Sequence, residues 1–372
     1  MQDQTAVRDG LEGVVAATTK LSAVDGERGE LIIAGHTLRE LAANWSFEEV
    51  VDLLWRTAGA TIRRPATLEL PPRTLNLLLG AARERLDPMD ALRMAIGSLR
   101  SRDDESDARS LMGSCPAIVA AYARLLAGRE PLARNPALGL SANFLYMLTG
   151  NEPEDELVAA LDTYLTTVCD HGFNASTFTA RVIVSTGSDF ISAVTGAIGA
   201  LKGPLHGGAP GPALDTVFAI ERKDRAESFL RAKLERGERL MGFGHRIYNV
   251  RDPRADVLNA AVARMFEGSG DTALYELARH VEGTAVRLLA EYKPARDLQT
   301  NVEFFTALLL HGLGIDREFF TPTFAIGRMA GWIAHCIEQR AEGRLIRPQS
   351  LYVGELPQSE LAAQIAPRSN RR

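Results

Sequence analysis

Cysteines are few in this chain and long apolar runs are absent, and each shortage excludes a class of protein. The 372 residues include only three cysteines, Cys115, Cys169 and Cys336, which lack the spacing of metal ligands. We expect them to be buried thiols in a reducing compartment, the cytoplasm. No apolar stretch reaches the ~18 residues that a membrane-spanning helix needs. The first residues also lack the basic and then apolar pattern of a secretory signal peptide.

An excess of positive charge is lacking as well. The net charge is −5 at pH 7, which argues against a general nucleic-acid binder, because such proteins normally present a basic face. Hydrophobic residues make up 46% of the chain and charged residues 24%, the composition of an ordinary globular protein. A chain of this length can bury a substantial core and form one large domain or two.

The apolar residues recur mainly at helical spacing. Apolar positions three and four residues apart appear at 38–42, 50–54, 75–79 and 329–337, as on one face of a helix. Alternation is short, and its best example, at 30–34, predicts a small hairpin between residues 22 and 36. The charged run 101–107 predicts an exposed loop. Small residues at 177–201 predict close packing against another helix, of this chain or of a second subunit. The fold class predicted is mainly α.

Three short segments, far apart in sequence, carry side chains suited to one kind of reaction. Residues 203–208 (GPLHGG) place His206 in a sharply turning backbone, and residues 242–245 (GFGH) do the same for His245, shortly before Arg254. Residues 301–305 (NVEFF) place the carboxylate of Glu303 beside aromatic rings. Two imidazoles that polarise oxygens, one carboxylate that accepts a proton and nearby guanidiniums suit carbon–carbon bond formation through an enolate.

In these segments the chain resembles the citrate synthases. The likeness runs in family order through residues 10–17, 24–27, 47–50, 170–177, 201–208, 242–254, 324–335 and 346–354. Each segment alone is a weak signal, whereas the ordered set is specific. The resemblance implies a large helical, dimer-forming domain of residues 1–207 and 316–372, with a small helical domain, 208–315, inserted in it and the active site in the cleft. The expected hinges are Gly207-Gly208 and Gly312-Leu313-Gly314, because glycines tolerate large backbone changes.

The resemblance also implies a reaction, the condensation of acetyl-CoA with oxaloacetate to citrate, through an enolate and a citryl-CoA thioester that is then hydrolysed. Glu303 matches the family's base, which removes a proton from the acetyl methyl group. His206 matches the residue that donates a hydrogen bond to the enol oxygen. His245 matches the residue that binds the ketone oxygen of oxaloacetate and protonates the alkoxide.

Four further positions match residues that bind oxaloacetate in the family: His171, Arg254, Arg328 and Arg347. Guanidinium groups suit this role because each can hold a carboxylate with two hydrogen bonds. In the family, the arginine at the position of Arg347 enters the partner subunit's site, so the resemblance implies a homodimer.

The binding of CoA is less visible in the sequence. The resemblance places the coenzyme against the backbone around residues 205–209, and positive charge makes two further arginines candidates for its phosphates. The candidates are Leu205, Gly207, Ala209, Arg246 and Arg251. For the two arginines, solvation at the surface is an equally good interpretation. No metal ion and no permanently bound cofactor are expected.

Simpler interpretations exist for the charged candidates. Arg254 follows an aspartate and a proline, so it could pair with a carboxylate at the start of a helix. Arg328 and Arg347 could be solvated helix charges, and Glu303 could be a capping or ion-paired carboxylate.

Three departures from the family pattern leave the substrate open. Glu303 stands where aspartate is usual, and its extra methylene moves the carboxylate by about 1 Å or more. Pro210 and Pro212 stiffen the segment after His206 and remove backbone donors, and residues 34–36 (AGH) stand where Arg-Gly-Tyr is common. One alternative is a 2-methylcitrate synthase, since one methylene contributes only ~1–3 kcal/mol of discrimination. The other is a silent homologue that binds CoA or a dicarboxylate without turnover.

Overall fold

The structure, a computed structural model, describes residues 9–11, 13–62, 68–206, 210–245, 247–248, 250–269 and 272–355. The chain divides into two compact units, one of residues 19–345 and one of the terminal stretches 1–18 and 346–372. In the described part of the terminal unit, the regular structure is a short 3-10 helix, Asp9–Leu11. The side chains of Leu351, Tyr352 and Val353 in this unit are exposed.

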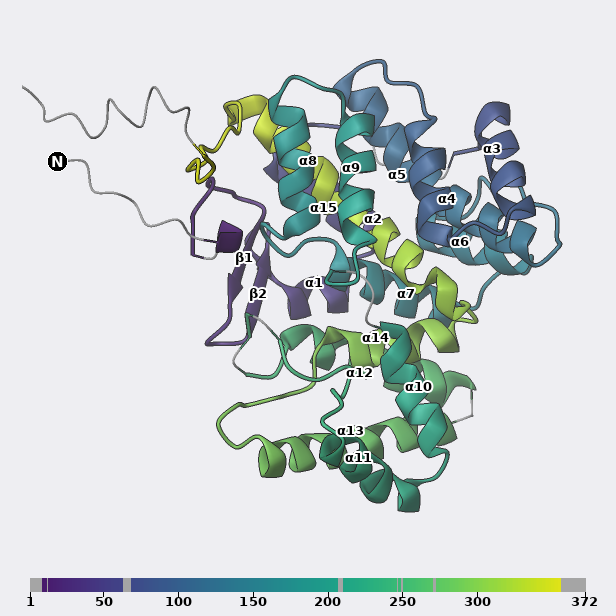
Figure 1. Ribbon diagram of the computed structural model, residues 1–372. Helices are drawn as coiled ribbons and strands as arrows, with labels where there is room; N and C mark the ends of the chain where they lie inside the picture. Colours follow the sequence, from purple (N-terminus) through teal and green to yellow (C-terminus); the bar gives the residue numbers. More distant parts are fainter. Residues whose placement is uncertain are drawn as a thin grey trace, which may run out of the picture. The chain divides into compact units, whose positions relative to one another are not determined.

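The described part of the main unit is mostly helical (Figure 1), as the sequence predicts. Its α-helices are α1 (Leu38–Asn44), α2 (Phe47–Thr57), α3 (Pro72–Arg83), α4 (Pro88–Gly97), α5 (Asp104–Leu126), α6 (Leu140–Thr149), α7 (Asp155–Val168), α8 (Ala175–Ser185), α9 (Phe190–Leu201), α10 (Pro210–Ile220), α11 (Ala226–Glu235), α12 (Pro253–Ser269), α13 (Ala273–Tyr292), α14 (Val302–Gly312) and α15 (Phe320–Glu342). Two 3-10 helices, η2 (Lys223–Arg225) and η3 (Arg317–Phe319), precede α11 and α15.

One small antiparallel sheet opens the main unit. Strand β1 (Ser22–Asp25) pairs with β2 (Glu30–Ile33), and β2 pairs with β3 (His36–Thr37). In β2, Leu31 and Ile33 are buried whereas Glu30 is exposed, the alternation of a strand with one face on the core. The predicted hairpin is therefore confirmed.

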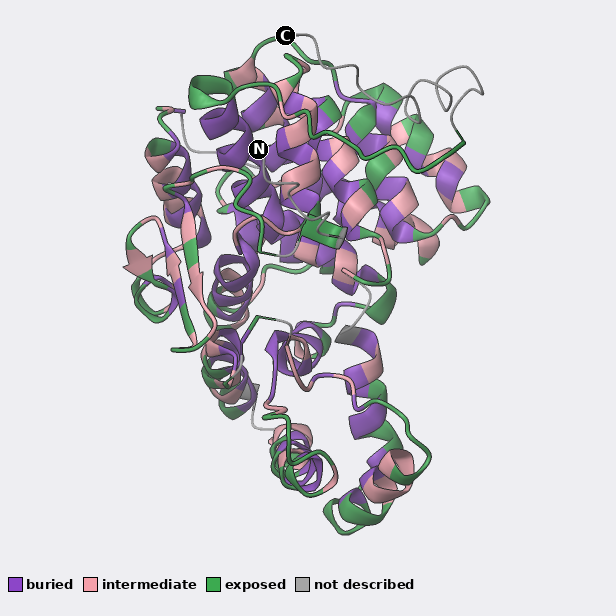
Figure 2. Cartoon of the chain, turned by 60° about the vertical axis from the view of Figure 1, so that its left-hand side comes forward, coloured by how far each residue is buried: buried purple, intermediate pink, exposed green. Residues whose placement is uncertain are grey.

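Helix α15 is almost entirely buried and packs against α2, α5, α7, α8 and α9. Two glycines let it approach the end of α7. A Cβ atom on Gly327 would lie 2.6 Å from Cγ2 of Val168, and one on Gly331 would lie 2.3 Å from the carbonyl oxygen of Cys169. Any larger residue would push the helix away. The buried residues fill the interior of the helical bundle (Figure 2).

The small-residue segment 177–201 spans α8 and α9, which pack against each other within one chain. A Cβ atom on Gly196 would lie 2.3 Å from Cδ1 of Ile183, so the helices are in close contact, as the sequence predicts. The three cysteines are buried and free, as expected. None of the described helices is long and apolar enough to cross a membrane.

The prediction of an exposed loop over residues 101–107 is wrong for its second half. The Asp103 side chain accepts a hydrogen bond from the Ser106 amide, so α5 starts at Asp104. Asp107 is buried in the first turn, where it accepts hydrogen bonds from Ser101 Oγ (2.8 Å) and the amide of Arg102 (3.0 Å).

Helices α10 to α14 pack among themselves on one side of the main unit (Figure 1), and α12 and α14 also contact α7. The inserted domain expected over residues 208–315 stays a prediction. Of its expected hinges, Gly207 and Gly208 lie outside the described residues. A Cβ atom on Gly312 would lie 2.2 Å from Cε of Met265, and Gly314 has a φ of +71°.

Candidate active site

One asparagine links two of the three predicted segments. Oδ1 of Asn301 caps α14 by accepting a hydrogen bond from the amide of Glu303 (3.0 Å). Its side-chain Nδ2 donates to the carbonyl of Gly244 (2.9 Å), and its backbone amide donates to the carbonyl of Gly242 (3.0 Å). Both glycines have positive φ angles, +89° and +81°, which other residues rarely adopt. The segment before His245 therefore needs both glycines to turn against the start of α14.

Asp252 and Arg254 form a buried ion pair beside this turn. Nε and Nη2 of Arg254 donate to the two carboxylate oxygens at 3.0 and 2.9 Å. The carboxylate also accepts a hydrogen bond from the amide of Val302 (3.1 Å), which ties the pair to the start of α14. Burial alone would raise the pKa of Asp252, but the charge and hydrogen bonds of Arg254 bring it below its ordinary value. The simpler interpretation of Arg254, a partner for a carboxylate at a helix start, is thus correct for this conformation.

The ring of His245 lies between backbone amides and Arg254. Its Nδ1 accepts hydrogen bonds from the amides of Ile247 and Tyr248, both at 3.1 Å. The proton of the neutral ring must then lie on Nε2, which is 3.1 Å from Nη2 of Arg254. Burial, together with the charge of Arg254, lowers the pKa of His245 to about 4. Two donors, neither paired with the other, therefore point into the same region.

His171 completes this cluster. Its Nε2 lies 3.2 Å from the hydroxyl of Tyr248, and the centre of its ring lies 5.8 Å from that of His245. Burial lowers the pKa of His171 well below 6.5, and the charges of Arg254 and Arg328 lower it further. The ring is therefore neutral near pH 7.

His206 follows α9 and is held by a different set of side chains. Its Nε2 lies 2.9 Å from Oγ of Ser176. The same oxygen accepts a hydrogen bond from Nε1 of Trp332 (3.1 Å) and lies 2.7 Å from Oδ1 of Asn174. Burial, followed by the charge of Arg328, lowers the pKa of His206 to about 4. The ring is neutral near pH 7, so it carries one proton.

The single proton of the Ser176 hydroxyl decides where the His206 proton lies. If the hydroxyl donates to Asn174, it can only accept from His206, whose proton is then on Nε2. If it turns to His206, the ring proton lies on Nδ1, on the side away from Ser176. The serine therefore couples the ring's tautomer to the rotation of one hydroxyl.

Arg328 is buried, with 2% of its surface exposed, so the interpretation as a solvated charge is wrong. Its Nε donates to the carbonyl of Val168 (2.6 Å), and its guanidinium lies 4.8 Å from the ring centre of Phe324. Within the described part of the chain, its terminal nitrogens donate to no acceptor. Burial lowers the pKa of Arg328 to about 10. A buried guanidinium with free N–H groups is suited to an anionic ligand.

Glu303 is mostly buried at the second position of α14. Burial raises the pKa of Glu303 to about 7, although the charge of Arg254 opposes this. Its carboxylate forms neither a hydrogen bond nor an ion pair with another described residue, and the cap of α14 is Asn301. A carboxyl group in this state can accept or release a proton near pH 7.

The remaining predicted residues are engaged elsewhere, exposed or outside the described part of the chain. Arg251 is engaged by the protein, because its nitrogens lie 2.5 Å from Asp256 and 2.8 Å from Glu282. Leu205 is fully exposed. Arg347 belongs to the terminal unit and is exposed. Three candidates for CoA binding lie outside the described residues: Gly207, Ala209 and Arg246.

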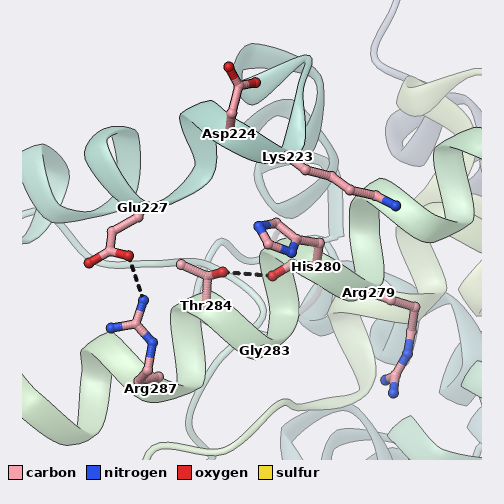
Figure 3. A pocket seen from close by; sticks show the side chains of 8 residues that line it. All are labelled: Lys223, Asp224, Glu227, Arg279, His280, Gly283, Thr284 and Arg287. Atoms are coloured by element: carbon pink, nitrogen blue, oxygen red, sulfur yellow. Dashed lines mark hydrogen bonds and ion pairs between the residues drawn. The ribbon is translucent and has the colours of Figure 1, made fainter.

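A separate groove of about 730 Å³ lies between η2–α11 and α13 (Figure 3). Its lining residues are Lys223, Asp224, Glu227, Arg279, His280, Gly283, Thr284 and Arg287. Three of its cations are already paired: Lys223 with Glu276, Arg279 with Glu282 and Arg287 with Glu227. The lysine and the arginines of the groove therefore already have carboxylate partners, unlike the terminal nitrogens of Arg328. Among the described residues, no group of three or more His, Cys, Asp and Glu side chains is arranged to hold a metal ion.

Comparison with known proteins shows the family to which this helical chain belongs. The family described as "Citrate synthase, C-terminal domain" matches residues 10–349. Citrate synthase of Haloferax volcanii is 38% identical, with 94% of this chain and 96% of that one aligned. Citrate synthase 2 of Bacillus subtilis is 39% identical, over 94% and 96%. 2-Methylcitrate synthase of Mycobacterium tuberculosis is 38% identical, over 95% and 92%.

Solved structures agree with this. Citrate synthase from Pyrobaculum aerophilum has a TM-score of 0.82 and 34% identity, with 94% of each chain covered. The Thermoplasma acidophilum enzyme, solved in a ternary complex with carboxymethyl coenzyme A and oxaloacetate, has a TM-score of 0.81 and 27% identity, over 94% and 98%. The chain belongs to the citrate synthase family.

The residues that hold the predicted side chains in place are not among the candidates that the sequence indicates. Ser176 and Asn301 lie inside the family segments, and a hydroxyl or amide there is a recognisable signal. The sequence indicates Asp252 only as a carboxylate partner for Arg254. Tyr248 gave no signal, because its contact with His171 joins residues 77 positions apart.

Proposed function

We propose that the protein is a citrate synthase that condenses acetyl-CoA with oxaloacetate to give citrate and CoA. One observation carries the proposal: the buried Arg328, whose terminal nitrogens find no described acceptor, lies within electrostatic reach of the neutral His171 and His206 and of Arg254. Arg254 in turn acts on a carboxyl group, that of Glu303, with a pKa of about 7. A dianionic keto acid supplies the carboxylates for the arginines and the ketone oxygen for an imidazole donor.

In the first step, Glu303 removes a proton from the methyl group of acetyl-CoA. Its raised pKa makes it a stronger base than an ordinary glutamate, while much of it is still ionised at neutral pH. His206 donates a hydrogen bond to the thioester oxygen as charge develops there. It does so from Nδ1, which carries the proton when the Ser176 hydroxyl turns toward Nε2.

In the second step, the enol carbon attacks the ketone carbon of oxaloacetate. Arg254, Arg328 and His171 bind the keto acid, and the Nε2 proton of His245 passes to the new alkoxide. The proton taken by Glu303 balances the one given by His245, so condensation needs no net proton. Water then cleaves the citryl-CoA thioester, which releases citrate, CoA and a proton.

The remaining parts of the proposal concern assembly and CoA. The protein is a homodimer in which Arg347 enters the partner subunit's site, and it acts in the cytoplasm in the tricarboxylic acid cycle. Its three free, buried cysteines support the reducing compartment. CoA binds at Leu205, Gly207, Ala209 and Arg246. Arg251 contacts the phosphates only if it leaves its carboxylate partners, Asp256 and Glu282.

A release assay for CoA, with acetyl-CoA and propionyl-CoA in parallel, tests the function. We expect thiol release that depends on oxaloacetate and is faster with acetyl-CoA. Faster release with propionyl-CoA would assign the protein to the 2-methylcitrate synthases, whose member in Mycobacterium tuberculosis is 38% identical. No oxaloacetate-dependent release from either thioester would instead indicate a binding protein.

A further inference from the structure

Helix α15 holds the backbone just before His171 at two successive points. Nε of Arg328 donates to the carbonyl of Val168 (2.6 Å), and the amide of Gly331 donates to the carbonyl of Cys169 (3.1 Å). The spacing along one helix matches consecutive residues of the segment. The position of His171 therefore depends on α15.

A third point is a buried side-chain contact one turn further along. Nε2 of His335 lies 3.2 Å from Oδ1 and 3.4 Å from Oδ2 of Asp170, and both residues are fully buried. On the other side of the ring, Nδ1 lies 3.1 Å from Nη1 of Arg181. A guanidinium only donates, so Nδ1 must carry a lone pair and the ring proton must lie on Nε2, facing Asp170. Arg181 therefore fixes the tautomer that donates to the carboxylate.

The far end of this chain of contacts is anchored in the core. Nη1 of Arg181 donates to Glu338 (2.6 Å), and Nε donates to Gln339 (3.0 Å). The guanidinium also lies 4.8 Å from the ring centre of Phe173, which itself packs edge-on against His335. Arg181 has 3% of its surface exposed, so it is not free to turn away from His335.

At the other end of the contacts, Ser22 binds the two residues that flank His171. Oγ of Ser22 donates to Oδ2 of Asp170 (2.5 Å) and accepts a hydrogen bond from the amide of Gly172 (2.9 Å). The serine thus joins the residues on both sides of the histidine. Asp170 also lies within electrostatic reach of Arg328, yet the two form no ion pair.

We propose that Arg181, His335 and Asp170 form a positioning chain that keeps the Asp170 carboxylate away from Arg328 and holds His171 in place. The chain rests on the proposed function, since its purpose is to leave the terminal nitrogens of Arg328 free for a substrate carboxylate. Without the donor from His335, the buried Asp170 carboxylate gains most by pairing with Arg328. It then competes directly with oxaloacetate.

The test replaces His335 and measures the KM values of the two substrates separately, together with the calorimetric Kd of oxaloacetate. His335→Phe keeps a ring but removes both nitrogen contacts. We expect it to raise the KM and Kd of oxaloacetate about tenfold or more, with the KM of acetyl-CoA within about twofold of wild type. His335→Gln restores a donor toward Asp170, so it should recover most of the oxaloacetate affinity.

Tyr122→Phe is the matched control, because it removes a buried hydroxyl that binds the carbonyls of Ala81 and Leu86 in another part of the core. It should leave both KM values unchanged. If His335→Phe does not fold, Ser22→Ala removes the second donor to Asp170 and should show the same selective loss of oxaloacetate affinity.

Unchanged oxaloacetate affinity in folded His335→Phe, or in Ser22→Ala where the first does not fold, overturns the positioning chain, as does an equal loss for both substrates. A different result would mark failure of the proposed function: the wild-type protein would show neither oxaloacetate binding nor oxaloacetate-dependent CoA release. That result removes the purpose of the chain as well, so it also overturns the inference.

Discussion

Nε2 of His245 lies 3.1 Å from Nη2 of Arg254, and both atoms are donors. Two N–H groups side by side cannot satisfy each other, and both are matched by an oxygen placed between them. In the proposed complex this oxygen comes from oxaloacetate. The pairing of Arg254 with Asp252 then fixes the guanidinium so that one nitrogen faces the imidazole.

Replacing Arg328 should separate binding from stability. In Arg328→Gln the buried positive charge is lost, so we expect the KM of oxaloacetate to rise at least about 100-fold, as for other desolvated charge pairs. The free energy of unfolding should stay the same or increase, because burying an unpaired cation is costly. Steady-state kinetics and urea denaturation measure the two effects.

Arg340→Gln is the matched control for that variant. Arg340 lies on the same helix, but it pairs at the surface with Asp104. It should leave the KM of oxaloacetate unchanged and alter stability by less than about 1 kcal/mol. An equal effect of both variants on oxaloacetate would contradict the role of Arg328.

The activity should fall on the acid side of neutrality. Glu303 must be ionised to remove a proton, and burial raises its pKa to about 7. We therefore expect kcat/KM for acetyl-CoA to decrease about tenfold per pH unit below that value, since one proton is involved. The histidines matter only at lower pH, because the pKa values of His206 and His245 are about 4. A profile that is flat between pH 5 and pH 8 would argue against Glu303 as the base.

The same carboxyl group should destabilise the folded protein at high pH. Its pKa rises from 4.5 to about 7 on folding, so between these values the folded state keeps a proton that the unfolded state has released. Its contribution to stability is therefore present below pH 4.5 and is lost as the pH rises to 7. The loss is at most about 3 kcal/mol.

Glu303→Gln removes this titration. We expect the variant and the wild type to unfold at similar urea concentrations at pH 4.5, and the variant to be more stable at pH 8 by up to about 3 kcal/mol. The comparison at two pH values is the control, because a general packing change would alter the stability of the variant equally at pH 4.5 and at pH 8. A difference that is the same at both pH values would mean that the carboxyl group is not buried in its protonated form.

Ser176→Ala should impair the chemical step rather than oxaloacetate binding. Without the hydroxyl, nothing directs the His206 proton to Nδ1, so we expect kcat to fall about tenfold or more while the KM of oxaloacetate is unchanged. Thr177→Val is the matched control, since the neighbouring hydroxyl is buried and has no hydrogen-bond partner in the part of the chain that the structure describes. Its removal should be neutral for activity and neutral or favourable for stability. Equal kcat values for the two variants would rule out a role for Ser176 in orienting His206.

The sequence predicts the helices and the hairpin well because both depend on local spacing. The alternation at 30–34 marks β2, and apolar residues three and four apart mark α1, α2, α3 and α15. Prediction from local spacing fails where a single hydrogen bond decides where a helix begins. An example is Asp103, whose side chain caps α5 inside a charged run. The composition of this run predicts a solvent-exposed loop, whereas the cap and the buried Asp107 favour a helix.

The candidate site is predictable in its parts and not in its connections. Family segments select His171, His206, His245 and Glu303, and their roles remain predictions. The contact of Ser176 with His206 joins α8 to the loop after α9, and the contact of His335 with Asp170 spans 165 residues. Such pairs depend on how helices pack, which local spacing does not encode.

The central claim is that Glu303 removes the proton that starts condensation, and CoA release by wild type and Glu303→Gln at pH 8 tests it most directly. With acetyl-CoA and oxaloacetate, we predict rapid release by the wild type and a rate lower by at least about 100-fold in the variant, with oxaloacetate affinity retained. Equal rates for the two proteins would contradict it.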